Sequence, residues 1–144
     1  MRATPEVLQG TALFSELSLE DCQRIIERSG SRSVDGGHTF TVQGVSNPDL
    51  QVIIDGSADV YVHDHHVRRL TVGDYFGEAS LLDNAPRSAT IVAADDGCTT
   101  LLIPQLAFWE IVDEHPHVAR PLLRGLAIRL RNAEEALWAK RTND

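Results

Sequence analysis

The chain has 144 residues, a length that favours a single domain with its own hydrophobic core. Its net charge of −8 disfavours the broad cationic surface with which proteins bind DNA or anionic membranes. No apolar run approaches the roughly 18 residues that a membrane span needs, and the N-terminal segment lacks the apolar core of a secretion signal. We therefore expect a cytoplasmic protein that binds neither DNA nor a membrane.

The first predicted element is a helix over residues 18–29. Ser18 is a candidate N-cap, with Asp21 three residues later as in a capping box. Apolar residues then recur at helical spacing, and Gly30 can end the helix.

Between residues 31 and 103 the pattern changes to short runs rich in Val, Ile, Thr and Tyr, separated by turn residues. The sequences Asp55-Gly56 and Asp95-Asp96-Gly97 predict turns, because glycine tolerates a positive φ. Short strands at this spacing predict a mainly β fold, a β-roll or jelly-roll barrel with flanking helices. The candidate strands are Thr39–Val42, Leu50–Ile54, Ala58–Val62, Val67–Leu70, Ala89–Ala93 and Thr99–Ile103.

A helical period returns after the last strand, and we expect C-terminal helices over residues 105–140. Phe108 and Trp109 are expected to be core aromatics beneath the barrel, and Pro116 to occupy the first turn of the last helix. An apolar stripe over residues 121–140 can bury against the barrel or against a second copy. This stripe is therefore a candidate homodimer or effector contact of a single domain spanning residues 1–144.

One stretch, Phe76–Thr90, interrupts the barrel with the sequence FGEASLLDNAPRSAT. Gly77 precedes a predicted short helix, whose free backbone N–H groups form a natural anion site. Arg87 follows a turn, and its guanidinium can hold two phosphate oxygens, with Ser88 as a further donor. Glu78 accepts hydrogen bonds when ionised, so it suits sugar hydroxyls or Arg87 rather than a phosphate. These residue types together favour a sugar-phosphate ligand.

The stretch resembles the phosphate-binding cassette of the cyclic-nucleotide-binding domain family, whose pattern is roughly F-G-E-x-A/S-L-L, a short turn, then P-R-S/T/A-A-T. Gly73-Asp74 before the cassette and His115-Pro116 between the last helices fit the family as well, so the resemblance covers residues 12–135. It implies a sensor domain and not an enzyme. Such a domain binds cyclic AMP or cyclic GMP without a cofactor, and its C-terminal helices move to cover the ligand. Family frequency favours cyclic AMP.

The resemblance also implies roles for individual residues. Glu78 would bind the ribose 2′-hydroxyl, Arg87 would pair with the cyclic phosphate, and Arg129 on the last helix would reach toward both. Two valines on the barrel wall would pack near the base or sugar. The implied ligand-binding residues are Phe76, Gly77, Glu78, Ala79, Ser80, Arg87, Ser88, Val60, Val67 and Arg129.

The sequence of the last helix does not identify the residue that would contact the base. Some family members touch the base through a hydroxyl pair there, whereas this chain has Ala133-Glu134 at the corresponding place. Asn132 or Trp138 could substitute, the latter by stacking on the base.

Two alternatives come from other classes of protein. The first is a nucleotide-free interaction module that keeps the fold and the cassette. The second is a cupin-like metalloprotein, suggested by His63, His65 and His66, although such a site needs a further acid and a further histidine inside the barrel. These histidines have the pattern of a hairpin tip that faces solvent. Cys22 and Cys98 are expected to be reduced, buried thiols. We therefore expect no metal site.

Overall fold

Helices precede and follow the strands in the computed structural model, which describes residues 2–142. The elements are α1 (Pro5–Gln9), α2 (Leu19–Glu27), β1 (Gly30–Val34), β2 (Thr39–Thr41), β3 (Leu50–Val62), β4 (His65–Leu70), β5 (Tyr75–Phe76), α3 (Glu78–Asp83), β6 (Thr90–Ile103), α4 (Gln105–Glu114), the 3₁₀ turn η1 (Pro116–Val118) and α5 (Ala119–Thr142).

The predicted N-terminal helix is α2. The Ser18 hydroxyl accepts a hydrogen bond from the backbone N–H of Asp21 at 3.1 Å, which confirms the predicted N-cap. The helix ends at Glu27, earlier than predicted, and Gly30 begins β1 instead of ending the helix. The five-residue helix α1 was not predicted, since it is too short for its apolar positions to show a period.

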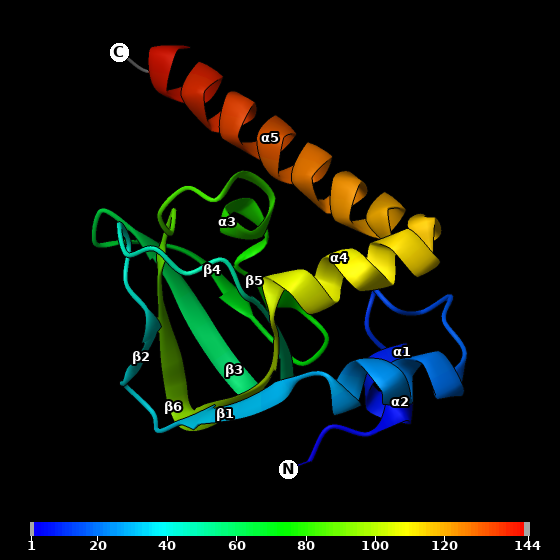
Figure 1. Ribbon diagram of the computed structural model, residues 1–144. Coiled ribbons are helices and arrows are strands. Elements are labelled where there is room, and N and C mark those ends of the chain that lie inside the picture. The colour runs from blue at the N-terminus through cyan, green and yellow to red at the C-terminus, as the bar shows by residue number, and fades with distance from the viewer. Residues whose placement is uncertain (1, 143–144) are drawn as a thin grey trace.

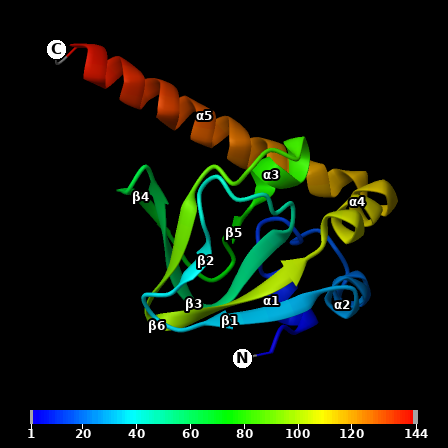
Figure 2. The ribbon, with the colours of Figure 1, turned by 60° about the vertical axis from the view of Figure 1, so that its left-hand side comes forward.

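All strands belong to one antiparallel sheet. The main path runs β1-β6-β3-β4, with β2 paired to β6 and β5 paired to β3. Figures 1 and 2 show that the sheet curls into a roll, with α1, α2 and α4 gathered at one side and α5 passing over α3. The mainly β roll with flanking helices is therefore confirmed.

The two longest strands correct the prediction of separate short ones. β3 and β6 each run unbroken through the sequences predicted as turns at Asp55-Gly56 and at residues 95–97. Gly56 and Gly97 do have positive φ, at 76° and 81°, and a side chain at Gly56 would strike the Gly97 carbonyl oxygen. The register of β3 against β6 shifts around Gly56. These glycines thus form bulges that bend paired strands, without reversing the chain.

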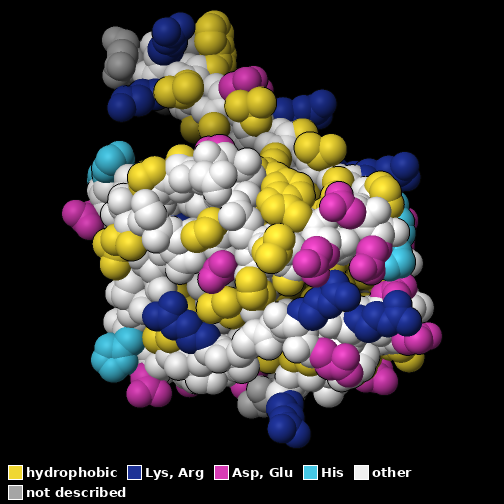
Figure 3. All heavy atoms as spheres, viewed as in Figure 1, with side chains coloured by type: hydrophobic (Ala, Val, Ile, Leu, Met, Phe, Trp, Pro, Cys, Tyr) yellow, Lys and Arg dark blue, Asp and Glu magenta, His cyan; other side chains and the backbone are white. Residues whose placement is uncertain are grey.

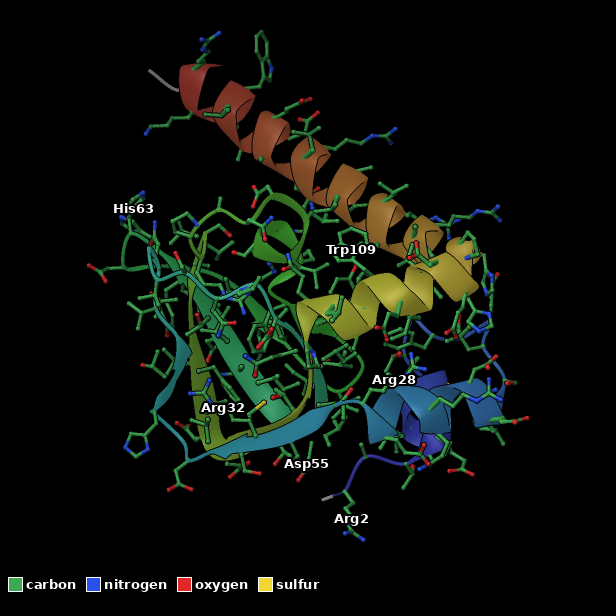
Figure 4. All side chains as sticks on the ribbon, viewed as in Figure 1. Arg2, Arg28, Arg32, Asp55, His63 and Trp109 are labelled. Carbon is green, nitrogen blue, oxygen red and sulfur yellow. The ribbon has the colours of Figure 1, made fainter. Side chains whose placement is uncertain are left out.

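Buried hydrophobic residues form two clusters, one inside the roll and one between the sheet and the N- and C-terminal helices. Phe108 of α4 is fully buried in the second cluster, as predicted. Trp109 is 37% exposed, which corrects its prediction as a core residue. Successive helical residues point about 100° apart, so these two neighbours cannot both face the same core. Figure 4 places Trp109 on α4, on the side toward α5.

Most of the apolar stripe on α5 does not bury against the barrel. Leu122 is buried near the start of the helix, and η1 rather than α5 begins at Pro116. Farther along, α5 extends beyond the roll, where Figure 3 shows hydrophobic side chains on its surface. The exposed apolar residues of α5 are Leu123, Ile128, Leu130, Leu137 and Trp138. Within residues 2–142, no helix is long and apolar enough to cross a membrane.

The histidine segment forms the β3–β4 hairpin. His63 and Asp64 make its turn with positive φ, and Figure 4 places His63 at the edge of the molecule. His65 and His66 are exposed as predicted, and the His66 ring is 2.9 Å from a carboxylate oxygen of Asp59. No cluster of three or more His, Cys, Asp or Glu residues in the described part of the chain could hold a metal. The cysteines are both buried and free, as predicted.

Candidate ligand-binding site

The site begins at the left-handed residue before α3. Gly77 has φ 93° and ψ 2°, and it is the N-cap residue of α3 without any side chain to cap the helix. A Cβ at this position would collide with Nη1 of Arg87 and lie 2.5 Å from the carbonyl oxygen of Asp49. Only glycine therefore fits the backbone conformation and the close approach of Arg87 together.

Arg87 is a buried cation with free hydrogen-bond donors. It is 4% exposed, and its Nη2 donates to the carbonyl oxygen of Asp49 at 2.7 Å. Its Nε and Nη1 are buried without a partner in the part of the chain that the structure describes. Burial lowers the pKa of Arg87, and the charge of Asp49 opposes that shift. Because arginine keeps its proton in proteins, two unpaired donors here favour an anionic ligand.

The backbone of Arg87 is fixed by the segment before β3. Its N–H donates to Val45 at 2.8 Å, and its carbonyl accepts from the Gly44 N–H at 2.9 Å. These bonds fix the Arg87 backbone, and the bond from Nη2 to the Asp49 carbonyl holds the guanidinium beside Gly77.

Glu78 connects the cassette to the last helix. Its side chain is buried and forms an ion pair with Arg129 of α5. The residue types alone suggested sugar hydroxyls or Arg87 as partners of Glu78, and the family resemblance also implied that Arg129 reaches toward it. The observed partner is Arg129. Burial lowers the pKa of Arg129, and the positive charge of Arg68 lowers it further. The ion pair thus links α3 to α5.

The predicted residues, apart from the two valines, line one cavity. They come from β5, α3, the turn before β6, and α5. The cavity volume is about 30 Å³, room for a water molecule or two. A sugar-phosphate is larger than this volume, so it would have to displace lining side chains or extend beyond the cavity. Residues that line the cavity without having been predicted are Thr41, Arg68, Ala89 and Ile91.

Val67 is the clearest correction among the predicted site residues. It is 50% exposed on the outer face of β4, whereas Leu70 on the same strand is buried. Val60 is buried in the core cluster inside the roll and does not line the cavity. Side chains alternate along a strand, so an inward Leu70 places Arg68 inward and Val67 outward. The alternation was visible in the sequence and would have pointed to Arg68.

Neither candidate for the base contact on α5 lines the cavity. Asn132 and Trp138 lie past Arg129, and Trp138 is 64% exposed on the part of α5 that extends beyond the roll.

Comparison with known proteins agrees with this geometry. The family model of the cyclic nucleotide-binding domain matches residues 31–115. A cAMP-dependent protein kinase regulatory subunit of Debaryomyces hansenii is 32% identical over 110 residues, which cover 76% of this chain and 24% of that protein. The cGMP-dependent protein kinase of Plasmodium berghei is 46% identical over 59 residues, covering 41% of this chain and 7% of that kinase. The structure of the Thermus thermophilus catabolite activator protein is similar with a TM-score of 0.79 at 29% identity, covering 88% of this chain and 62% of that one.

The family match contains the cassette, α4 and nearly the whole sheet, so the chain belongs to the cyclic nucleotide-binding domain family. It resembles the corresponding domains of catabolite activator proteins and of kinase regulatory subunits. The chain spans about a quarter of the length of the fungal regulatory subunit.

Proposed function

We propose that this domain is a sensor that binds cyclic AMP or cyclic GMP reversibly. The observation that carries the proposal is the buried Arg87, which lines the cavity and whose Nε and Nη1 have no partner among the described residues, with Nη1 beside Gly77. The cyclic phosphate binds there, assisted by the free backbone N–H groups at the start of α3 and by Ser88. The Glu78 carboxylate accepts a hydrogen bond from the ribose 2′-hydroxyl. One relative is named for cyclic AMP and another for cyclic GMP, so the comparisons do not decide which base the domain prefers.

The same contacts supply the coupling to α5. A ribose at Glu78 must share or displace Arg129, so the ligand changes the ion pair that holds α5 over the cassette. The α5 backbone also packs on the barrel at Gly125, where a Cβ would lie 2.7 Å from the Tyr75 hydroxyl. Tyr75 stands immediately before Phe76 and the cassette, so α5 contacts the segment that leads into the cassette as well as Glu78. The nucleotide selects the α5 position in which it binds more tightly.

Titration calorimetry of the purified protein tests the proposal. Cyclic AMP or cyclic GMP should bind with measurable heat, and the linear nucleotides 5′-AMP and 5′-GMP should bind much more weakly, because the second phosphate charge of a linear nucleotide is costly to bury beside Glu78. No heat with either cyclic nucleotide at millimolar concentration would favour a nucleotide-free interaction module.

The role of Glu78 is tested with Glu78→Gln. The variant should lose discrimination between a cyclic ribonucleotide and its 2′-deoxy analogue, because a carboxylate accepts a stronger hydrogen bond from the hydroxyl than an amide does. The matched control is Arg129→Gln, which breaks the same ion pair and leaves the carboxylate in place. This control should keep the discrimination. Equal discrimination in the wild type and in Glu78→Gln would refute the sugar contact.

The exposed face of α5 is the proposed output surface, and we assign it to a second copy of this chain. Leu123, Leu130 and Leu137 recur every seven residues and are 63%, 60% and 65% exposed, a spacing that supports helix pairing along one seam. Analytical ultracentrifugation should find a dimer in the wild type and a monomer in Leu130→Glu, with nucleotide binding retained. A wild-type monomer at about 100 μM, a concentration well above a micromolar Kd, would refute the pairing.

A further inference from the structure

A second groove, here called the α5–loop groove, lies between α5 and the loop that joins α1 to α2. Its volume is about 400 Å³, against about 30 Å³ for the cavity at the cassette, and the two share no lining residue. Figure 1 shows the loop after α1 rising toward the first turns of α5. A groove of this size can hold a small organic molecule. The lining residues are Ala12, Ser15, Glu16, Tyr75, Arg120, Pro121, Arg124, Gly125 and Ile128.

The floor of the α5–loop groove is mostly apolar and lies where α5 meets β5. Gly125 has no side chain, and a Cβ there would lie 2.7 Å from the Tyr75 hydroxyl. Pro121 lies four residues before Gly125 and Ile128 three residues after it, so all three share one face of the helix. Tyr75, Pro121 and Gly125 are partly buried, whereas the loop residues of the groove are exposed. An apolar ligand body can therefore lie against this face of α5.

Three side chains of the α5–loop groove offer hydrogen-bond donors that no acceptor within residues 2–142 takes. Arg120 and Arg124 lie one turn apart on α5, are exposed, and form no side-chain hydrogen bond or ion pair there. The Tyr75 hydroxyl has no hydrogen bond either, and burial raises its pKa, so it stays protonated and can donate. Glu16, on the loop side, pairs with neither arginine. Two cations and a neutral donor against one carboxylate favour an anionic ligand.

We propose that the α5–loop groove is a second ligand site and that it takes a small amphipathic carboxylate. The two carboxylate oxygens match the planar guanidinium donors of Arg120 and Arg124. The apolar body of the ligand covers the helix face of Gly125 and Ile128. Because the groove and the cassette cavity share no residue, this site stands independently of the nucleotide-binding function proposed above.

A ligand in the α5–loop groove acts on the helix that also contacts the cassette. Arg129, the partner of Glu78, follows the groove residues on α5. A ligand that joins α5 to Tyr75 and to residues 12–16 stabilises the position of α5 in which Arg129 pairs with Glu78. A cyclic nucleotide must share or displace that ion pair, so the two ligands oppose each other by linkage. This consequence, unlike the site itself, rests on the proposed function.

Titration of the ¹⁵N-labelled protein with 2-naphthoate tests the site by NMR. The probe carries one carboxylate on an apolar body, and it should bind with a Kd of about 1 mM or below, as a ligand of its size can. It should shift the amide resonances of residues 12–16, 75 and 120–128. The neutral analogue 2-naphthalenemethanol should bind at least about tenfold more weakly. Equal binding of the two probes, or shifts confined to residues 130–142, would overturn the site.

Variants on α5 identify the contact with the carboxylate. The double variant Arg120→Gln, Arg124→Gln should weaken 2-naphthoate at least about tenfold and leave the neutral probe and the melting temperature unchanged, because neither guanidinium has a partner to lose. Arg131→Gln is the matched control, since Arg131 is an exposed arginine of α5 outside the groove. It should bind both probes like the wild type. An equal loss in Arg131→Gln would show attraction by the charge of the helix alone and overturn the site.

Two further outcomes would assign the α5–loop groove to a different occupant and overturn the small-ligand proposal. Tighter binding of the blocked dipeptide N-acetyl-Phe-Glu-amide than of 2-naphthoate would indicate an acidic peptide of a partner protein. The same resonance shifts on concentrating the protein without any probe would indicate a second copy of this chain.

The opposition between the two ligands is measured separately. Saturating 2-naphthoate should raise the apparent Kd for cyclic AMP or cyclic GMP, and the double variant, which should bind the nucleotide like the wild type, should lose this effect. An unchanged nucleotide Kd would overturn the coupling. If the wild type binds no cyclic nucleotide, the proposed function fails, and the 2-naphthoate titration still decides whether the groove is a ligand site.

Discussion

Replacing Arg87 by leucine is expected to weaken nucleotide binding strongly, and calorimetry can measure the loss of affinity. The substitution deletes the two donors of this cavity-lining residue, Nε and Nη1, that are buried without a partner in the described part of the chain. A hydrogen bond to a charged group contributes roughly 1.5–3 kcal/mol, so the loss should be at least about 2 kcal/mol, or roughly 30-fold in Kd. Unchanged affinity in Arg87→Leu would refute the phosphate contact.

Stability should respond to Arg87→Leu in the opposite direction from binding. A buried cation with unpaired donors costs free energy in the nucleotide-free protein, and only the bond to the Asp49 carbonyl is lost in exchange. The melting temperature without ligand should therefore be unchanged or higher. Arg32→Leu is the matched control. Arg32 donates to the Phe40 carbonyl at 2.7 Å and lies over the Phe40 ring, outside the cavity lining, so this variant should lose stability and keep binding.

Gly77→Ala is expected to have the second large effect. The new Cβ would occupy the position of Nη1 of Arg87 and press on the Asp49 carbonyl oxygen, while φ 93° strains any residue other than glycine. Movement of Arg87 out of this position should remove binding, and the melting temperature should fall as well. Thermal melting and calorimetry on the same samples measure both effects.

Gly73→Ala provides the control for backbone strain alone. Gly73 has φ 95°, almost the same as Gly77, and a Cβ there would meet no atom within 4 Å. The control should lose the roughly 1–2 kcal/mol that a left-handed residue costs and keep its nucleotide affinity. If Gly77→Ala and Gly73→Ala lost equal stability and both kept binding, the close contact between Gly77 and Arg87 would have no functional role.

The chemistry of the site was predictable from the sequence because the cassette is local. Gly77, Glu78 and Arg87 lie within a short stretch, and their residue types alone favour a sugar-phosphate ligand. The Ser18 cap was predictable for the same reason, since a cap depends on residues three positions apart.

The rest depends on contacts that are distant in the chain. The bulges at Gly56 and Gly97 arise because the two glycines face each other across β3 and β6, which no local pattern of turn residues reveals. The partner of Glu78 comes from α5, and the position of α5 is set by packing at Gly125 and Leu122. Arg68 was not among the predicted site residues, although its alternation with the buried Leu70 along one strand places it on the inner face of the roll.

The structure of the protein crystallised with saturating cyclic AMP or cyclic GMP tests the central claim most directly. We predict phosphate oxygens at about 3 Å from Nε and Nη1 of Arg87, a 2′-hydroxyl at hydrogen-bond distance from Glu78, and α5 shifted from its present contact. A nucleotide bound elsewhere, such as in the groove between α5 and residues 12–16, with Arg87 still unpaired, would contradict the account.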